Sequence, residues 1–539
     1  MSDQGEWTPQ GRPVTGWQQN MQPHPQPHAQ SPPYPPPSRP RRGGSPWGLL
    51  LAVPAVVLLV TQQVLPAIRT LLLGVETGEG PITRSVRPEF VTGMLATFGL
   101  GAAFATLGLC LGLVVGAALR RGSALLAQLG LGLLGLTLLA FAPLLHGIGV
   151  LDRFGIGALW PHLAVLVLPT LVIGGVLGAI SRSARVTTGI SVAVVLAGAA
   201  WSAQTDMGYV MGAVSPGHDI YRLGFAMMDL QGAAVLSVLL AVPVSILGIV
   251  AMLVLLASRA RLRLADGQRA GSPAGVIGVV LSVVAVVAAV VVAWPWLGQT
   301  LSLGGPGVES AAIMARTLSL DLGNAAVLTV ICGAAAIGIG YLRPIGAASP
   351  WLLLIFSPWF FTGLFPTVVA RFEVARESGG LGVEPYAGLT PPFVVVPLLV
   401  LLTFIADGAR RAREEGGRIP WGRSLAIGLL GVGFTLWVQR QTALHTFVFS
   451  YDTDVPSAQY VVLTSFTRME DPAVGLLVPL PMLMIAAFVF ALGVAAFGRM
   501  SLAVAGTVPA RSVTGVPPGG APPGHVPPLP DPTSREDRP

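Results

Sequence analysis

Residues 201–263 read WSAQTDMGYVMGAVSPGHDIYRLGFAMMDLQGAAVLSVLLAVPVSILGIVAMLVLLASRARLR, and they join a polar segment to a long apolar run. The run, from about 232 to 257, holds no charged residue and is long enough to cross a bilayer. Arg259, Arg261 and Arg263 follow it, and by the positive-inside rule they place that end in the cytoplasm. The polar segment before the run is therefore expected on the outer side.

The composition of the whole chain agrees with a membrane protein. Of 539 residues, 53% are hydrophobic and only 11% are charged, which is too little charge to cover the surface of a soluble fold of this length. The formal net charge of +7 does not indicate nucleic-acid binding, because the arginines cluster at the ends of apolar runs, where topology signals lie.

Hydropathy predicts about twelve membrane spans. The first six are 47–72, 90–119, 123–147, 160–181, 187–204 and 231–257. The next six are 274–297, 317–342, 349–370, 392–406, 424–440 and 474–498. The predicted fold is an all-α polytopic protein, multi-pass in a plasma membrane of the bacterial type, with both termini in the cytoplasm.

These spans divide the chain into five parts. We expect a disordered Pro-rich cytoplasmic tail at 1–46, a first six-helix half at 47–265, an inner linker at 266–273, a second six-helix half at 274–505 and a disordered Pro/Gly-rich tail at 506–539.

The loop charges sort as this topology requires. Predicted inner loops hold most of the arginines, among them Arg120, Arg121, Arg182, Arg185, Arg259, Arg261, Arg263, Arg343, Arg410, Arg411 and Arg413. Predicted outer loops hold most of the acids, among them Glu76, Glu79, Asp152, Asp206, Asp219, Glu373, Glu377, Asp452 and Glu470. A miscounted span would scramble this sorting in every later loop.

A weak repeat with a long period supports two halves. Phe225-Ala-Met-Met-Asp229 precedes the sixth span, and Phe466-Thr-Arg-Met-Glu470 precedes the twelfth. Each half would hold an even number of spans, so the two halves would run parallel, which is a known plan among transporters.

The layout resembles the permease subunits of binding-protein-dependent ABC importers, the maltose-type sugar group, over residues 47 to 500. In that family a Gly-Pro turn leads through Y-x-x-x-F into a final helix rich in small residues. The matching residues here are Pro216-Gly217, Tyr221, Phe225, Asp229, Gly232, Ala233 and Ala234. Further matches in layout are Trp47 to Pro54, Trp294-Pro295-Trp296, Thr317 to Tyr341 with Asn324, and Phe447 to Phe466.

The resemblance implies two fused permease subunits that move a carbohydrate by alternating access. Separate cytosolic ABC ATPases would supply hydrolysis, and an extracellular solute-binding protein would deliver the solute. The chain departs from the family at the coupling segment, which reads E-A-A and then D-G-A. The first half has only Ser181 to Thr188 there, and the second has Asp407-Gly408-Ala409 without E-A-A. We expect any ATPase coupling to use Asp407, Gly408 and Ala409.

Polar and aromatic residues at the ends of two equivalent spans suit a sugar. They are Trp201, Gln204, Trp437, Gln439 and Arg440. An aromatic face beside amide donors matches the apolar face and the hydroxyls of a sugar ring. The alternative is structural, because tryptophan near a span end anchors the interface and amides bridge helices.

The sequence predicts no enzyme and no cofactor. It contains no lysine, which excludes a Walker A loop and Schiff-base chemistry, and its two cysteines and seven histidines form no metal-ligand spacing. Two alternatives to the importer remain open. One is a permease-derived membrane protein without ATPase coupling, a scaffold or assembly partner. The other is a secondary transporter, for which a buried ionisable pair near mid-membrane is expected.

Overall fold

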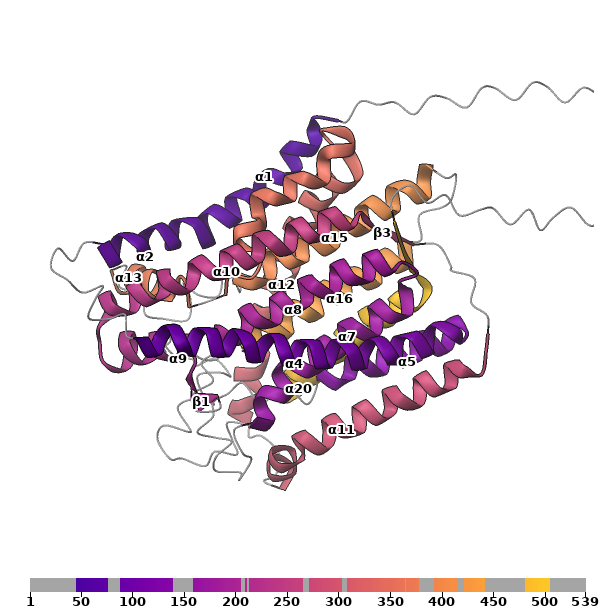
Figure 1. The fold of residues 1–539 in the computed structure, drawn as a ribbon, viewed down its shortest axis with the longest axis horizontal. Coiled ribbons are helices and arrows are strands. Elements are labelled where there is room, and N and C mark those ends of the chain that lie inside the picture. Colours follow the sequence, from indigo (N-terminus) through magenta and orange to yellow (C-terminus); the bar gives the residue numbers. More distant parts are fainter. Residues whose placement is uncertain are drawn as a thin grey trace, which may run out of the picture. The chain divides into compact units, whose positions relative to one another are not determined.

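The computed structural model describes residues 45–75, 88–138, 159–204, 209–210, 213–264, 271–302, 308–363, 365–377, 392–414, 421–441 and 480–504 (Figure 1). This part of the chain is mostly helical, as predicted. The two predicted tails lie almost entirely outside it.

The elements follow one another in chain order. The first part forms α1 Trp47–Leu59, η1 Val60–Val64, α2 Leu65–Val75, α4 Pro88–Arg121, α5 Ala124–Leu136, α7 Leu159–Ile180, α8 Ala184–Ala203, β1 Tyr209–Val210, β2 Ala213–Val214, α9 Pro216–Tyr221, η3 Arg222–Ala226, α10 Leu230–Ser258 and β3 Ala260–Arg263. The second forms α11 Ala274–Ser302, α12 Val308–Ala336, η4 Ile337–Leu342, η5 Gly346–Trp359, α13 Val368–Glu377, α15 Pro392–Glu414, α16 Trp421–Gln441, α20 Leu480–Ala496, η6 Phe497–Arg499 and β4 Ser501–Val504.

Six stretches within the described residues are helical, long enough and apolar enough to cross a membrane. They are Trp47–Val75, Pro88–Arg121, Ala184–Ala203, Leu230–Ala257, Ala274–Val292 and Leu322–Leu342. Helices also overlap the other six predicted spans, and four of them contain shorter apolar stretches among the described residues, Ala124–Leu136, Leu166–Ile180, Ser424–Leu436 and Met484–Arg499. One of these six spans differs in kind: η5 is a 3₁₀ helix that contains Pro350 and Pro358.

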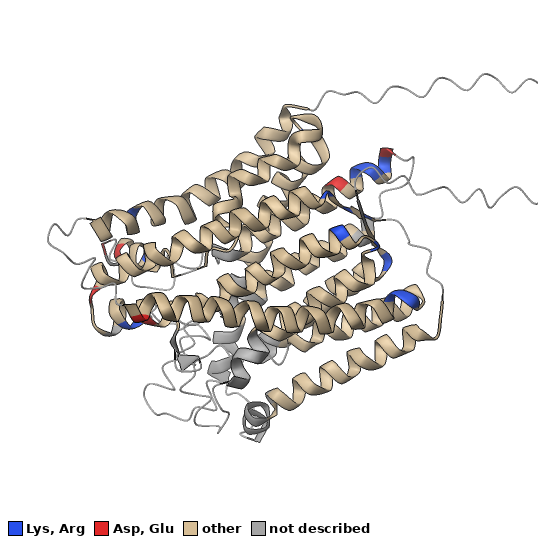
Figure 2. Cartoon of the chain, in the orientation of Figure 1, with Lys and Arg blue, Asp and Glu red and all other residues tan. Residues whose placement is uncertain are grey.

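The helix surfaces are those of a membrane protein. Among the described side chains of α11, Val276, Val280, Val283, Val287 and Val291 are exposed and follow one another at helical spacing. A stripe of that kind would be unstable in water and is at home against lipid. Figure 2 shows most of the charged residues in the described part of the chain towards the ends of the helices.

Glycines set the closest helix contacts. On α4 they recur every fourth residue at Gly108, Gly112 and Gly116, along the face that packs on α7. A Cβ added at Gly112 would lie 2.2 Å from the carbonyl oxygen of Leu171, so no larger residue fits there. Small residues at such spacing let two backbones touch, which is the usual way that helices associate in lipid.

The tetrapeptide pattern S-P-x-G occurs at the start of two helices and makes a similar contact at each. Ser45-Pro46-Trp47-Gly48 opens α1, and Ser272-Pro273-Ala274-Gly275 opens α11. The Ser45 amide donates to the Leu342 carbonyl at the end of η4 (3.3 Å), and the Ser272 amide donates to the Arg121 carbonyl at the end of α4 (2.9 Å).

The glycine of each tetrapeptide then meets another glycine. A Cβ on Gly48 would lie 2.6 Å from the Gly338 carbonyl oxygen, and a Cβ on Gly275 would lie 2.2 Å from the Gly122 Cα. The first helix of each predicted half thus begins against the end of the second helix of the other half.

The strands β3 and β4 pair antiparallel, with Ala260 opposite Val504 and Arg263 opposite Ser501. Ser501 follows Ala260 by 241 residues (501 − 260), the same separation as between Phe225 and Phe466 (466 − 225). Any two antiparallel strands pair in this reciprocal way, so the register joins the ends of the two predicted halves without itself indicating a repeat.

One apolar core joins elements of both predicted halves. It contains Ala193 of α8 and Met252 of α10 together with Leu328 of α12, Phe356 of η5 and Val396 of α15. Each of these side chains is buried. The contact between the halves is therefore filled with apolar side chains along this core.

Gly112→Ala should destabilise the protein by about 1–3 kcal/mol, because the new methyl group overpacks the contact between α4 and α7. Gly99→Ala on the same helix is the matched control, since nothing lies within 4 Å of a Cβ there. It should be neutral or stabilising by up to about 1 kcal/mol. Unfolding by SDS titration in mixed micelles measures both. Equal effects would contradict the close contact.

Candidate functional site

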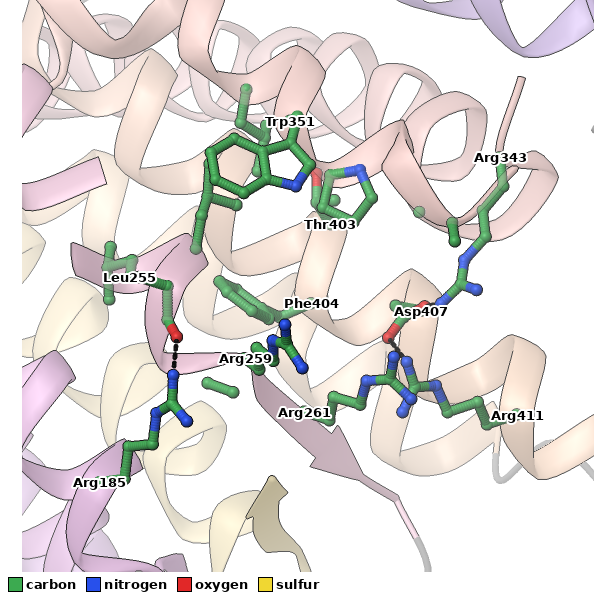
Figure 3. Close-up of a pocket in the computed structure, with 17 residues that line it drawn as sticks. Arg185, Leu255, Arg259, Arg261, Arg343, Trp351, Thr403, Phe404, Asp407 and Arg411 are labelled. Carbon is green, nitrogen blue, oxygen red and sulfur yellow. Dashed lines mark hydrogen bonds and ion pairs between the residues drawn. The ribbon is translucent and has the colours of Figure 1, made fainter. Parts of the chain in front are cut away.

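A cavity of about 740 Å³ lies where α8, α10 and β3 meet η4, η5 and α15 (Figure 3). Its charged lining residues are Arg185, Arg259, Arg261, Arg343, Asp407 and Arg411. Its apolar lining includes Leu255, Pro350, Trp351, Leu353 and Phe404. The cavity thus combines one strongly basic region with an apolar wall.

The ends of two helical segments place arginines at the cavity. α10 ends at Ser258, and Arg259 then takes the left-handed conformation with φ of 51°. Arg343 follows η4 in the same way, with φ of 48°. Glycine is usual at such positions because a side chain is strained there. β3 begins directly after Arg259, and Arg261 on this strand also lines the cavity.

Asp407 is the carboxylate at the centre of the charged group. Its Oδ2 accepts from Arg411 Nη2 at 2.6 Å, one helical turn further along α15, and its Oδ1 pairs with Arg343 Nη2. The Asp407 residue is 8% exposed. Because an ion pair so little exposed is weakly screened by water, it holds α15 firmly to the segment after η4.

Positive charge exceeds negative charge in the cavity. No described carboxylate forms an ion pair with Arg185, Arg259 or Arg261, and Arg185 Nη2 donates instead to the Ala257 carbonyl at 2.8 Å. Burial lowers the pKa of the Arg261 guanidinium, Asp407 opposes that change, and Arg343 and Arg259 add to it. The arrangement is therefore suited to an anion and offers no described nucleophile or metal-ligand cluster.

The predicted coupling triplet lies at this site but faces inward. Asp407, Gly408 and Ala409 belong to α15, which continues as a helix to Glu414. A Cβ on Gly408 would lie 2.5 Å from the Leu262 carbonyl oxygen of β3, so this turn of the helix packs on the strand. The triplet is used in contacts within the chain, and its role in ATPase coupling stays a prediction.

The predicted sugar-binding residues fall into two groups. Gln204 follows α8, and its Nε2 donates to the Ala200 and Phe361 carbonyls at 2.8 Å each, while its Oε1 accepts from the Gly363 amide at 2.6 Å. Its amide thus bridges α8 to the segment after η5, as the structural alternative predicts. Trp201 packs against the apolar core described above.

The second group lies in α16. Trp437, Gln439 and Arg440 are helical, but their side chains lie outside the described residues. The joint role of the two groups in binding sugar therefore stays a prediction.

Sequence reasoning missed that the inner arginines converge. It treated them as topology signals only, although Arg259, Arg261 and Arg263 alternate as residues on one face of a strand do. It also missed Arg371 of α13, whose side chain is buried and donates to the Gln62 carbonyl within η1. A buried arginine so close to a helix backbone joins α13 to the first helix.

Comparisons with protein-family models, curated proteins and solved structures find no match.

Asp407→Asn should lower the free energy of unfolding by about 3 kcal/mol, because Arg343 and Arg411 would lose their shared carboxylate in a buried place. Glu414→Gln is the matched control on the same helix. Its ion pair with Arg410 is exposed, so its loss should cost less than about 0.5 kcal/mol. SDS titration in mixed micelles measures both, and similar effects would show that Asp407 is not a central contact.

Proposed function

We propose that the chain is a multi-pass plasma-membrane protein built from two fused six-helix, permease-like halves that does not couple to an ABC ATPase. It serves as a membrane scaffold or assembly partner. The halves run over 47–265 and 274–505 with both termini in the cytoplasm.

The absence of room for a docking helix carries this proposal. α7 ends at Ile180 and α8 begins at Ala184, so only three residues connect them. Two of these three are already engaged with β4: Ser181 bridges to Leu502, and the Arg182 amide donates to the Leu502 carbonyl at 3.5 Å. An ATPase-coupling segment of the importer family would need short helices at this place.

The second half is little longer at the equivalent connection. α15 ends at Glu414 and α16 begins at Trp421, which leaves six residues between them. The D-G-A triplet that precedes this connection packs on β3 and pairs with arginines, as described above. The apolar core that joins α8 and α10 to α12, η5 and α15 also favours a protein whose halves stay together.

The proposal of two permease-like halves rests on the exchanged contacts, in which the first helix of each half begins against the end of the second helix of the other half. Each tetrapeptide S-P-x-G begins a helix against the other half, and β3 of the first half pairs with β4 of the second. Contacts of this kind support two related halves facing each other about an approximate two-fold axis.

A second candidate is the transmembrane part of an ABC importer for carbohydrate. It is favoured by the basic cavity between the halves at one end and by the Gln204 bridge to Phe361 at the far end of α8. This candidate requires ATPase docking by a surface other than the two short connections.

Affinity purification of the full chain from its native membrane in mild detergent separates the two candidates. We expect the tagged protein to be recovered intact without an ABC ATPase or an extracellular solute-binding protein in stoichiometric amount. A resident ABC importer of the same cell, tagged and purified alongside, is the control for complex survival. Recovery of both partners with this chain would overturn the proposal and establish the importer.

The exchanged contacts predict that the two halves bind each other when the chain is divided. Co-expressed as 1–267 and 268–539, they should copurify through a tag on either one. Gly275→Leu should reduce that recovery severalfold because its side chain would meet Gly122, whereas Gly428→Leu, in open space, should leave it unchanged. Independent purification of the unmodified halves would contradict the two-fold plan.

A further inference from the structure

We propose that the arginine-lined cavity between α10, β3, η5 and α15 binds a phosphate group that carries a net negative charge. The group is either the headgroup of an anionic phospholipid or a free phosphate-bearing solute. This inference concerns a ligand site and does not depend on whether the chain couples to an ATPase.

The first argument is the excess of positive charge. Five guanidinium groups line one cavity, and Asp407 is the only carboxylate among its lining residues. Asp407 already serves Arg343 and Arg411, which leaves Arg259 and Arg261 without a described carboxylate. Charges that are partly removed from water are costly without a counter-charge, so an anion in the cavity would stabilise this arrangement.

The second argument is independent and comes from the backbone. In the described residues three non-glycine residues have a left-handed φ, and two of them, Arg259 and Arg343, line this cavity. Both occupy positions where glycine would relieve strain. Strained backbone that carries a charged side chain into a cavity is characteristic of binding sites, because the gain comes from the side chain.

The third argument concerns ligand chemistry. Arginine presents a planar fork of donors that matches the oxygens of phosphate, and several forks from different elements can surround one tetrahedral group. In Figure 3 the arginines come from α8, the end of α10, β3, the end of η4 and α15. A single carboxylate ligand would engage fewer of them.

The apolar wall admits a lipid. Leu255, Leu353 and Phe404 line the same cavity, and Trp351 beside them is half exposed. Basic pockets between membrane helices on the cytoplasmic side hold anionic headgroups, and tryptophan commonly lies at that depth. A soluble phosphate ester would use the arginines alone, so the two sources differ in their need for the apolar wall.

The test uses the full-length protein in neutral detergent and four probes: dioctanoyl phosphatidylglycerol, dioctanoyl phosphatidylcholine, glycerol 3-phosphate and inorganic phosphate. Isothermal titration calorimetry measures affinity. Saturable binding of phosphatidylglycerol without binding of the two soluble phosphates assigns the site to a lipid headgroup. Binding of a soluble phosphate assigns it to a solute. Binding of none of the phosphates, or equal binding of phosphatidylcholine, overturns the proposal.

Arg259→Gly is the decisive variant. It removes one guanidinium and relieves the left-handed strain, so the protein should remain as stable as the unmodified chain while its affinity falls at least about tenfold, the effect of one charge-assisted hydrogen bond. Arg261→Ala should weaken binding to a similar extent, and it tests the same site with a second lining residue.

Two controls complete the experiment. Met228→Gly relieves the third left-handed residue, which does not line the cavity, and should leave affinity unchanged. Arg263→Ala removes an arginine of the same strand that does not line the cavity, and should change affinity less than twofold. Unchanged affinity in both cavity variants, or an equal loss in the controls, would overturn the proposal. Recovery of an ABC ATPase with the chain would leave these results unaffected.

Discussion

The contact of helix backbones with one another is the constraint on which the described structure depends. Apolar side chains gain little from meeting each other in lipid, so helices associate where their surfaces fit closely. Gly108, Gly112 and Gly116 supply such a surface on α4, and Gly174 and Gly178 of α7 meet it. Because that face of α4 packs on α7, large apolar side chains on its other faces, such as Leu107, Leu111 and Val114, remain exposed for lipid.

Polar groups are then used where one part of the chain must be fixed to another. The amide of Gln204 makes all three of its contacts to backbone, so it bridges two segments without leaving an unsatisfied atom. The Asp407 carboxylate of α15 likewise joins two segments, because it pairs with Arg343 after η4 as well as with Arg411 of its own helix. Because buried polar groups without partners are costly in a membrane, such residues determine which segments meet, whereas the glycines determine how closely.

Sequence reasoning succeeded where a single physical signal dominated. Long apolar runs bounded by arginines predicted α4 and α10 to within a few residues, since hydropathy and loop charge both mark the same boundaries. It could not predict the 3₁₀ geometry of η5, because hydropathy describes that segment as an ordinary span and internal prolines also occur in α1, α7, α10 and α15, which are α-helical. The repeat S-P-x-G was visible in the sequence, but four residues gain meaning only when their partners at Arg121 and Leu342 are known.

The sequence did not predict the cavity, because its arginines come together only in the folded chain. Each of its arginines follows the positive-inside rule, so each one alone is explained by topology. The information that they converge lies in the left-handed turns at Arg259 and Arg343 and in the pairing of β3 with β4, neither of which hydropathy reports. Asp407 was singled out from the sequence for its neighbours in a D-G-A triplet, and its ion pairs are a property of the fold.

The paired strands β3 and β4 differ in their side chains. β3 reads Ala-Arg-Leu-Arg, and β4, at the equivalent positions, reads Ser-Leu-Ala-Val. The backbone pairing treats the two strands alike, but only β3 carries charge, and Met500 stands where the repeat would place a counterpart of Arg259. The backbone pairing positions the two strands, and the difference between their side chains makes this contact basic on the β3 side. A repeated fold that retained arginines on both strands would bring like charges together across the pair, which is unfavourable. The restriction of the basic residues to one strand is therefore what allows them to gather in one cavity beside Asp407.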